Sequence, residues 1–79
     1  MIIKMTVDKE ADAVYLYLSK KKVAYSKELD AERIADYSDD GELRGIEFLS
    51  VSSGVNTNDL PHKAEIEKAL RDKGIRAFA

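Results

Sequence analysis

The first fifty residues of this chain alternate apolar and polar side chains with a period of two, and this pattern limits the possible folds most. Such alternation is typical of antiparallel strands that bury one face and expose the other. It occurs in five runs, at residues 2–7, 13–18, 23–29, 33–38 and 42–51. We therefore predict a five-stranded antiparallel sheet whose strands follow one another as a β-meander.

The runs differ in the solvent exposure that they predict for each strand. Residues 13–18 include no charged side chain, so we expect both faces of this strand to be covered, as in a central strand. Residues 23–29 are interrupted by Lys27 and fit a strand nearer an edge.

Asp39-Asp40-Gly41 separates the fourth and fifth runs and sets their register. A two-residue turn would place Ile34 opposite Glu47, whereas a three-residue loop with a left-handed Gly41 shifts the pairing by one residue. The longer loop gives four favourable pairs, namely Asp36–Arg44, Arg33–Glu47, Ile34–Ile46 and Tyr37–Leu43. We therefore predict the longer loop, with Asp36 and Glu47 on opposite faces. Gly45 then faces Ala35, and so small a pair indicates a bulge or a close approach of other atoms.

A helical period follows the sheet. We predict one helix over residues 59–73, capped by Asp59 and ended by a left-handed Gly74. Its apolar stripe is narrow, so the helix should lie against one face of the sheet. The fold class is then α+β, a single domain over 1–79 with the sheet in 1–51 and a tail in 74–79. The aromatic ring of Phe78 in that tail either enters the protein's own core, which we favour, or docks on a neighbouring molecule.

Composition excludes several classes of function. The 79 residues include 13 Lys and Arg, 15 Asp and Glu, one histidine and no cysteine. Without cysteine there is no disulfide, thiolate metal site or cysteine nucleophile, and His62 has no second catalytic residue at a meaningful spacing. The charge balance argues against nucleic acid as a partner, and no apolar run is long enough for a membrane span. We expect a cytoplasmic protein with no cofactor and no enzymatic activity.

Tyrosines are the most suggestive surface feature. Tyr15, Tyr17 and Tyr25, together with Phe78, are candidate interface residues, because tyrosine is enriched where proteins meet. Two alternatives stay open, since the helix either covers these rings or leaves them exposed. In the second case the exposed sheet face suits a second copy of the chain, packed about a two-fold axis.

The carboxylates on the predicted strands support an alternative function, the binding of a small ligand or a metal ion. Asp36, Glu47 and Asp12 would serve a small ligand or a divalent cation, which needs several converging oxygen atoms. The predicted register places Asp36 and Glu47 on opposite faces, so a cross-strand pair of Asp36 with Arg44 is favoured over a metal site.

Two segments together resemble the small prokaryotic family catalogued as domain of unknown function 2283. They are residues 7–16, VDKEADAVYL, and residues 34–49, IADYSDDGELRGIEFL. The first has two aspartates four apart followed by an aromatic residue, and the second has the pattern Asp-Tyr-x-x-x-Gly-x-x-x-Gly-Ile-Glu. The matching positions are Asp8, Asp12, Asp36, Gly41, Gly45 and Glu47, and each has a structural explanation in a turn, a close contact or a cross-strand pair.

The resemblance covers about residues 2–50 and leaves out the helix and the tail. It implies a small antiparallel sheet and no catalytic residues. Some members lie beside genes for small toxin-like proteins, which implies an antitoxin-like or partner-binding role. Our leading hypothesis is a homodimeric interaction module that binds another small protein, and the alternative is a ligand-binding or metal-binding domain.

Overall fold

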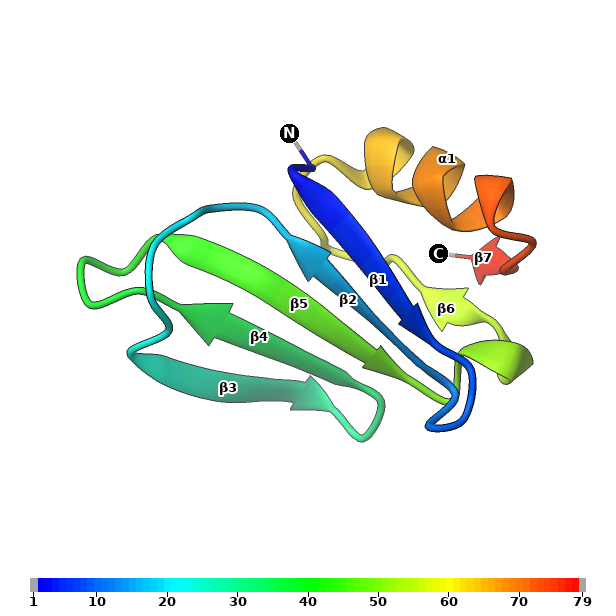
Figure 1. Cartoon of the computed structure of the whole chain (residues 1–79), viewed down its shortest axis with the longest axis horizontal. Coiled ribbons are helices and arrows are strands. Elements are labelled where there is room, and N and C mark those ends of the chain that lie inside the picture. The colour runs from blue at the N-terminus through cyan, green and yellow to red at the C-terminus, as the bar shows by residue number, and fades with distance from the viewer. Residues whose placement is uncertain (1, 79) are drawn as a thin grey trace.

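The computed structural model describes residues 2–78, so Met1 of the predicted sheet segment and Ala79 of the predicted tail lie outside the described residues. The main sheet is followed by one helix (Figure 1). Its strands are β1 (Lys4–Asp8), β2 (Ala13–Tyr17), β3 (Tyr25–Asp30), β4 (Arg33–Tyr37) and β5 (Leu43–Leu49), and the helix is α1 (Lys63–Asp72). This five-stranded antiparallel sheet with one C-terminal helix confirms the predicted α+β class.

The strand order is β1-β2-β5-β4-β3, which differs from the sequential order of a meander. After β2 the chain passes β5 and β4 and adds β3 at the far edge (Figure 1). The reason is burial, because β2 and β5 carry the apolar side chains that face the core, whereas all six residues of β3 are exposed. Pairing the two apolar strands with each other keeps the core continuous.

The hairpin between β4 and β5 combines both registers considered from the sequence. Gly41 is left-handed (φ 85°) and Tyr37 lies opposite Leu43, as the three-residue loop predicts. A bulge at Arg44 then shifts the register, so Ile34 lies opposite Glu47. Four predicted pairs are therefore wrong: Asp36–Arg44, Arg33–Glu47, Ile34–Ile46 and Ala35–Gly45. The predicted separation of Asp36 and Glu47 is also wrong, because the bulge brings both side chains to the same face.

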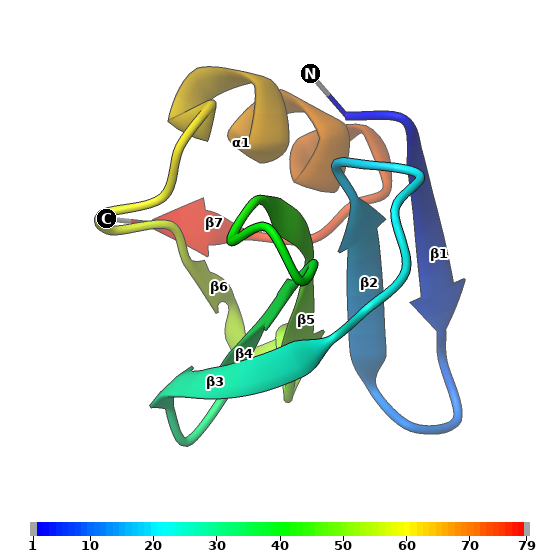
Figure 2. The same cartoon turned by 90° about the vertical axis from the view of Figure 1, so that its left-hand side faces the viewer.

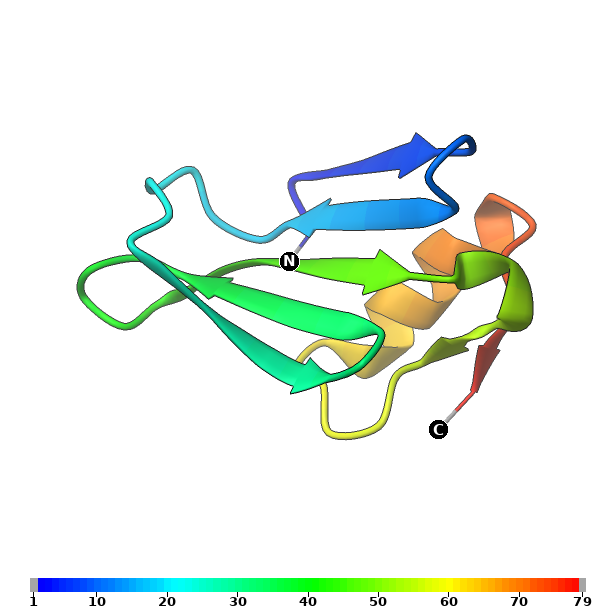
Figure 3. The same ribbon diagram turned by 90° about the horizontal axis from the view of Figure 1, so that it is seen from below.

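One face of the sheet carries the core. Val14 and Leu16 of β2 and Ile46 and Phe48 of β5 pack there against the helix. Residues from α1 and from the segment between β5 and α1 complete the cluster, namely Ile66, Leu70, Val51 and Val55. Figures 2 and 3 show α1 on this side of the sheet and nothing layered on the other side.

The C-terminal part forms a small second sheet. Strand β6 (Val55–Asn56) follows the single-turn helix η1 (Val51–Ser53) and pairs in parallel with β7 (Ala77–Phe78). The sequence predicted neither strand. Phe78 is not in the core as predicted, because its backbone is held in β7 while its side chain remains 48% exposed.

The helix begins later than predicted. Its first residue is Lys63, and His62 rather than Asp59 occupies the N-cap position, without a side-chain capping bond. The predicted end is confirmed, since Gly74 is left-handed and the N–H of Ile75 donates to the carbonyl of Leu70 at 2.9 Å. Among residues 2–78, no helix is long and apolar enough to cross a membrane.

Candidate functional site

The sheet face opposite α1 carries a cluster of charged, polar and aromatic side chains, and we call it the open face. The registers place one set of side chains on it from four neighbouring strands. These are Lys4 and Thr6 of β1, Tyr15 and Tyr17 of β2, Glu47 of β5, and Ile34 and Asp36 of β4. Arg44, at the bulge, lies over the two tyrosines.

Tyr15 is at the centre of a hydrogen-bond network on this face. Its hydroxyl donates to Asp36 Oδ2 at 2.7 Å and accepts from Arg44 Nη1 at 2.9 Å. Ser26 Oγ donates to the other oxygen of Asp36 at 2.5 Å. Partial burial and the hydrogen bond to Asp36 raise the pKa of Tyr15 to about 12, although Arg44 acts in the opposite direction. Tyr15 therefore bridges the acid and the base that the sequence predicted to pair directly.

The aromatic rings and the cations of the open face are stacked together. Tyr15 and Tyr17 pack edge to face, with ring centroids 4.7 Å apart. The guanidinium of Arg44 lies 4.7 Å from the Tyr17 ring centroid, and Lys4 Nζ approaches the same ring at 5.6 Å. Arg44 Nε also donates to the carbonyl of Lys21 at 3.1 Å. These contacts hold Arg44 and both rings in defined positions without a covering layer.

Gly45 allows this packing. A Cβ atom at this position would lie 2.6 Å from Tyr15 Cζ and 2.6 Å from the carbonyl oxygen of Leu16. Both separations are shorter than van der Waals contact, so any larger residue would displace the ring or the sheet. The close approach predicted at Gly45 is confirmed, and the approaching atoms belong to Tyr15.

The four predicted interface residues do not form one surface. Tyr15 and Tyr17 lie on the open face, whereas Tyr25 projects from edge strand β3 on the opposite face. There it stacks on Tyr37 with centroids 5.2 Å apart and remains 51% exposed. The sequence also missed the position of Arg44, because this depends on a bulge.

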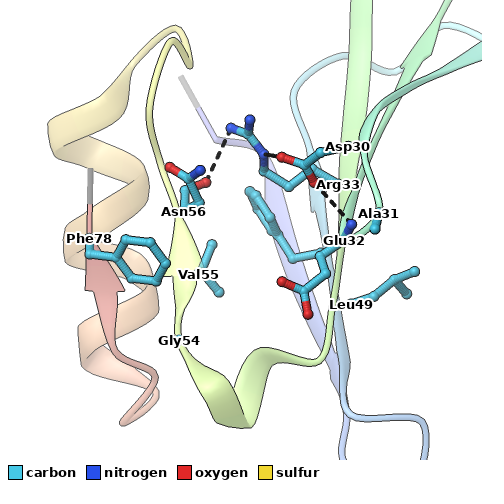
Figure 4. Close-up of a pocket in the computed structure, with 10 residues that line it drawn as sticks. Asp30, Ala31, Glu32, Arg33, Leu49, Gly54, Val55, Asn56 and Phe78 are labelled. Atoms are coloured by element: carbon cyan, nitrogen blue, oxygen red, sulfur yellow. Dashed lines mark hydrogen bonds and ion pairs between the residues drawn. The ribbon is translucent and has the colours of Figure 1, made fainter.

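Phe78 lines a groove of about 320 Å³ on another side of the molecule (Figure 4). The turn between β3 and β4 forms one wall, and β6 forms the other. Arg33 Nε donates to Asp30 Oδ2 at 2.8 Å, and Arg33 Nη1 donates to the carbonyl of Asn58 at 2.9 Å. Bonds from the Glu32 N–H and from Arg33 lower the pKa of Asp30. Arg33 therefore fixes the segment after β6 to the main sheet.

The remaining motif residues have local structural roles. Asp8 Oδ1 accepts a bond from the N–H of Ala11 at 3.0 Å, which confirms the predicted turn. Asp12 has a positive φ of 55°, and its carboxylate accepts bonds from the N–H of Ser52 at 3.0 Å and from its hydroxyl at 2.7 Å. It thus joins the β1–β2 turn to the segment after β5.

These contacts bear on the metal-binding alternative. Both oxygens of Asp36 already accept hydrogen bonds, and Asp12 is bound to Ser52 rather than directed at Glu47. Within residues 2–78, no three His, Cys, Asp or Glu side chains gather in a way that could hold a metal ion.

A family model described as "Protein of unknown function (DUF2283)" matches residues 4–52. The chain belongs to this family. No curated protein and no solved structure matches the chain. The DUF2283 match includes all five strands of the main sheet and ends at Ser52, the residue that Asp12 binds. The second sheet and α1 lie outside the match.

Five of the six DUF2283 motif residues lie in two places in this structure, and Gly41 lies in the turn between β4 and β5. Asp36, Gly45 and Glu47 lie around Tyr15 on the open face. Asp8 and Asp12 order the turn between β1 and β2. The resemblance found from the sequence is therefore confirmed, and three of the six motif residues lie at the open face, whereas none lines the groove at Phe78.

Proposed function

We propose that this DUF2283 chain is a non-enzymatic interaction module that forms a homodimer and binds a second small protein through the open face. The role would be antitoxin-like, in the cytoplasm of a prokaryotic cell. The single observation that supports binding is the cluster of Tyr15, Tyr17 and Arg44 on a sheet face that α1 leaves uncovered. Tyrosine and arginine dominate the energetic centres of protein interfaces.

The rigidity of the cluster supports the same proposal. Asp36, Ser26 and the carbonyl of Lys21 already restrain the side chains that a partner would touch. A side chain that is ordered before binding loses little entropy when the complex forms. The face also carries charges of both signs, Lys4 and Arg44 against Asp36 and Glu47, which suits a protein surface better than a phosphate backbone.

The test is co-purification from native-host extract with the tagged chain, compared between two tyrosine variants. Tyr17→Ala truncates the open face, and Tyr25→Ala removes an exposed ring from the opposite face as a matched control. We expect a stoichiometric small protein with the wild type and with Tyr25→Ala, and its loss with Tyr17→Ala. Equal recovery with both variants, or no stoichiometric protein at all, would contradict the role of the open face.

The homodimer is tested separately by sedimentation equilibrium over a range of concentrations. We expect the mass of two chains for the wild type and for Tyr17→Ala, because we assign the open face to the small partner protein rather than to the second copy. A mass of one chain at every concentration would remove the homodimer from the proposal and leave the partner-binding half standing.

A further inference from the structure

The connection between β6 and α1 is strained. Asp59 (φ 63°) and His62 (φ 54°) are non-glycine residues with positive φ, on either side of Leu60 and Pro61. A left-handed conformation brings the Cβ of an L residue close to a carbonyl oxygen. Pro61 fixes its own φ and restricts the residue before it. The path that turns the chain from β6 into α1 therefore places two non-glycine residues in the left-handed region within four positions, at a cost that is smaller for Asp and His than for most residue types.

Both ends of this connection are held firmly. Arg33 bonds to the carbonyl of Asn58, which fixes the chain up to that residue. The carbonyl of His62 accepts the first helical bond, from the N–H of Ile66 at 3.0 Å. Residues 59–62 are thus the short hinge between two ordered parts, and Figure 3 shows the loop that carries them between β6 and α1.

The segment after the hinge, residues 63–78, attaches through contacts with earlier residues. Ile66 and Leu70 are completely buried against the main sheet. The N–H groups of Val55 and Thr57 donate to carbonyls on the returning strand, those of Arg76 and Phe78, at 2.7 Å each. A second copy of the segment offers the same side chains and the same carbonyls.

We propose that residues 63–78 exchange between two copies, so that α1 and β7 of each copy complete the fold of the other. The inference rests on the homodimer in the proposed function and names its structure. Exchange preserves the contacts of α1 and β7 and changes the hinge, including the packing of Leu60. An extended hinge of four residues spans about 13 Å and no longer needs left-handed residues at Asp59 and His62. The open face lies on the far side of the sheet from α1 and stays accessible.

A mixed disulfide reports the exchange directly, because the natural chain has no cysteine. Asn56 and Phe78 are register partners on β6 and β7, so their Cα atoms are about 4.8 Å apart, within disulfide range. One chain carries Asn56→Cys, a second carries Phe78→Cys, and the two are unfolded and refolded together. We expect a covalent dimer on a non-reducing gel. Tyr25→Cys in place of Asn56→Cys is the matched exposed control and should give none.

Hinge variants test the cause. The double substitution Asp59→Gly with His62→Gly removes the energetic cost of left-handed backbone at these two positions. Only the monomer has this cost, because the hinge is extended in the exchanged dimer. The substitution therefore stabilises the monomer, and the dimer dissociation constant should rise about tenfold or more. Ser50→Gly is the matched control, since Ser50 is also left-handed (φ 54°) but lies outside the hinge and is strained in both forms. It should leave the constant unchanged.

The outcomes separate the two proposals. A dimer by sedimentation without the mixed disulfide, or with equal disulfide in the Tyr25→Cys control, would overturn the exchange and leave the homodimer. A monomer at every concentration would overturn both. An equal effect of the hinge and Ser50 variants would show that the strain at Asp59 and His62 does not drive exchange.

Discussion

Replacing Gly45 with alanine tests how the open face is built. The new Cβ would lie 2.6 Å from Tyr15 Cζ and 2.6 Å from the carbonyl oxygen of Leu16. The ring can retreat only by weakening its bond to Asp36, and the Leu16 carbonyl belongs to an interior strand. Overpacking of this kind costs about 1–3 kcal/mol. For a chain of this size, each kcal/mol lowers the melting temperature by about 4–8 °C.

The assay is urea unfolding of Gly45→Ala, with the near-ultraviolet circular dichroism of the tyrosines as a second signal. Gly41→Ala is the control, because Gly41 has a positive φ of 85° and no atom within 4 Å of an added Cβ. It should lose about 1 kcal/mol through backbone strain without altering the tyrosine signal. A loss below about 0.5 kcal/mol in Gly45→Ala, within the range of ordinary surface changes, would refute the close-approach argument.

Three further predictions concern other parts of the fold. Ile66→Ala should cost about 2–5 kcal/mol in urea unfolding because Ile66 is completely buried, whereas Ile3→Ala at an exposed site should cost less than about 0.5 kcal/mol. Asp12→Ala should cost about 1–2 kcal/mol in the same assay, since two bonds to Ser52 are lost. Stability should fall as pH rises from 10.0 to about 12, because folded Tyr15 keeps a proton that the unfolded chain releases, and Tyr15→Phe should reduce that fall.

Much of the main sheet was predictable from the sequence because its signals are local. Alternation located all five strands, and Asp8, Gly41 and Gly74 marked turns and a helix end by chemistry that depends on neighbouring residues. The order of the strands was not predictable in this way. It depends on which apolar strands meet across the core, and that is a contact between β2 and β5, far apart in the chain.

The open face was predicted only in part for the same physical reason. Tyr15 and Tyr17 were identified from their alternation in one strand. Neither the turn residues nor the cross-strand pairing preferences predict the bulge at Arg44. A single extra residue there moved Asp36 and Glu47 to the same face and converted a predicted ion pair into the bridge through Tyr15.

The C-terminal part shows where sequence patterns carry least information. Strands β6 and β7 are two residues each, which is too short to show an alternating pattern. The residues that they pair in parallel are more than twenty positions apart in the sequence. The late start of α1 coincides with the left-handed conformations of Asp59 and His62, which keep residues 59–62 out of the helix. Contacts at both ends hold this connection in its left-handed conformation. If a second chain supplies the same contacts, the connection can extend and lose that conformation. The residues at which the helix prediction failed are therefore the same residues at which exchange between two copies is proposed.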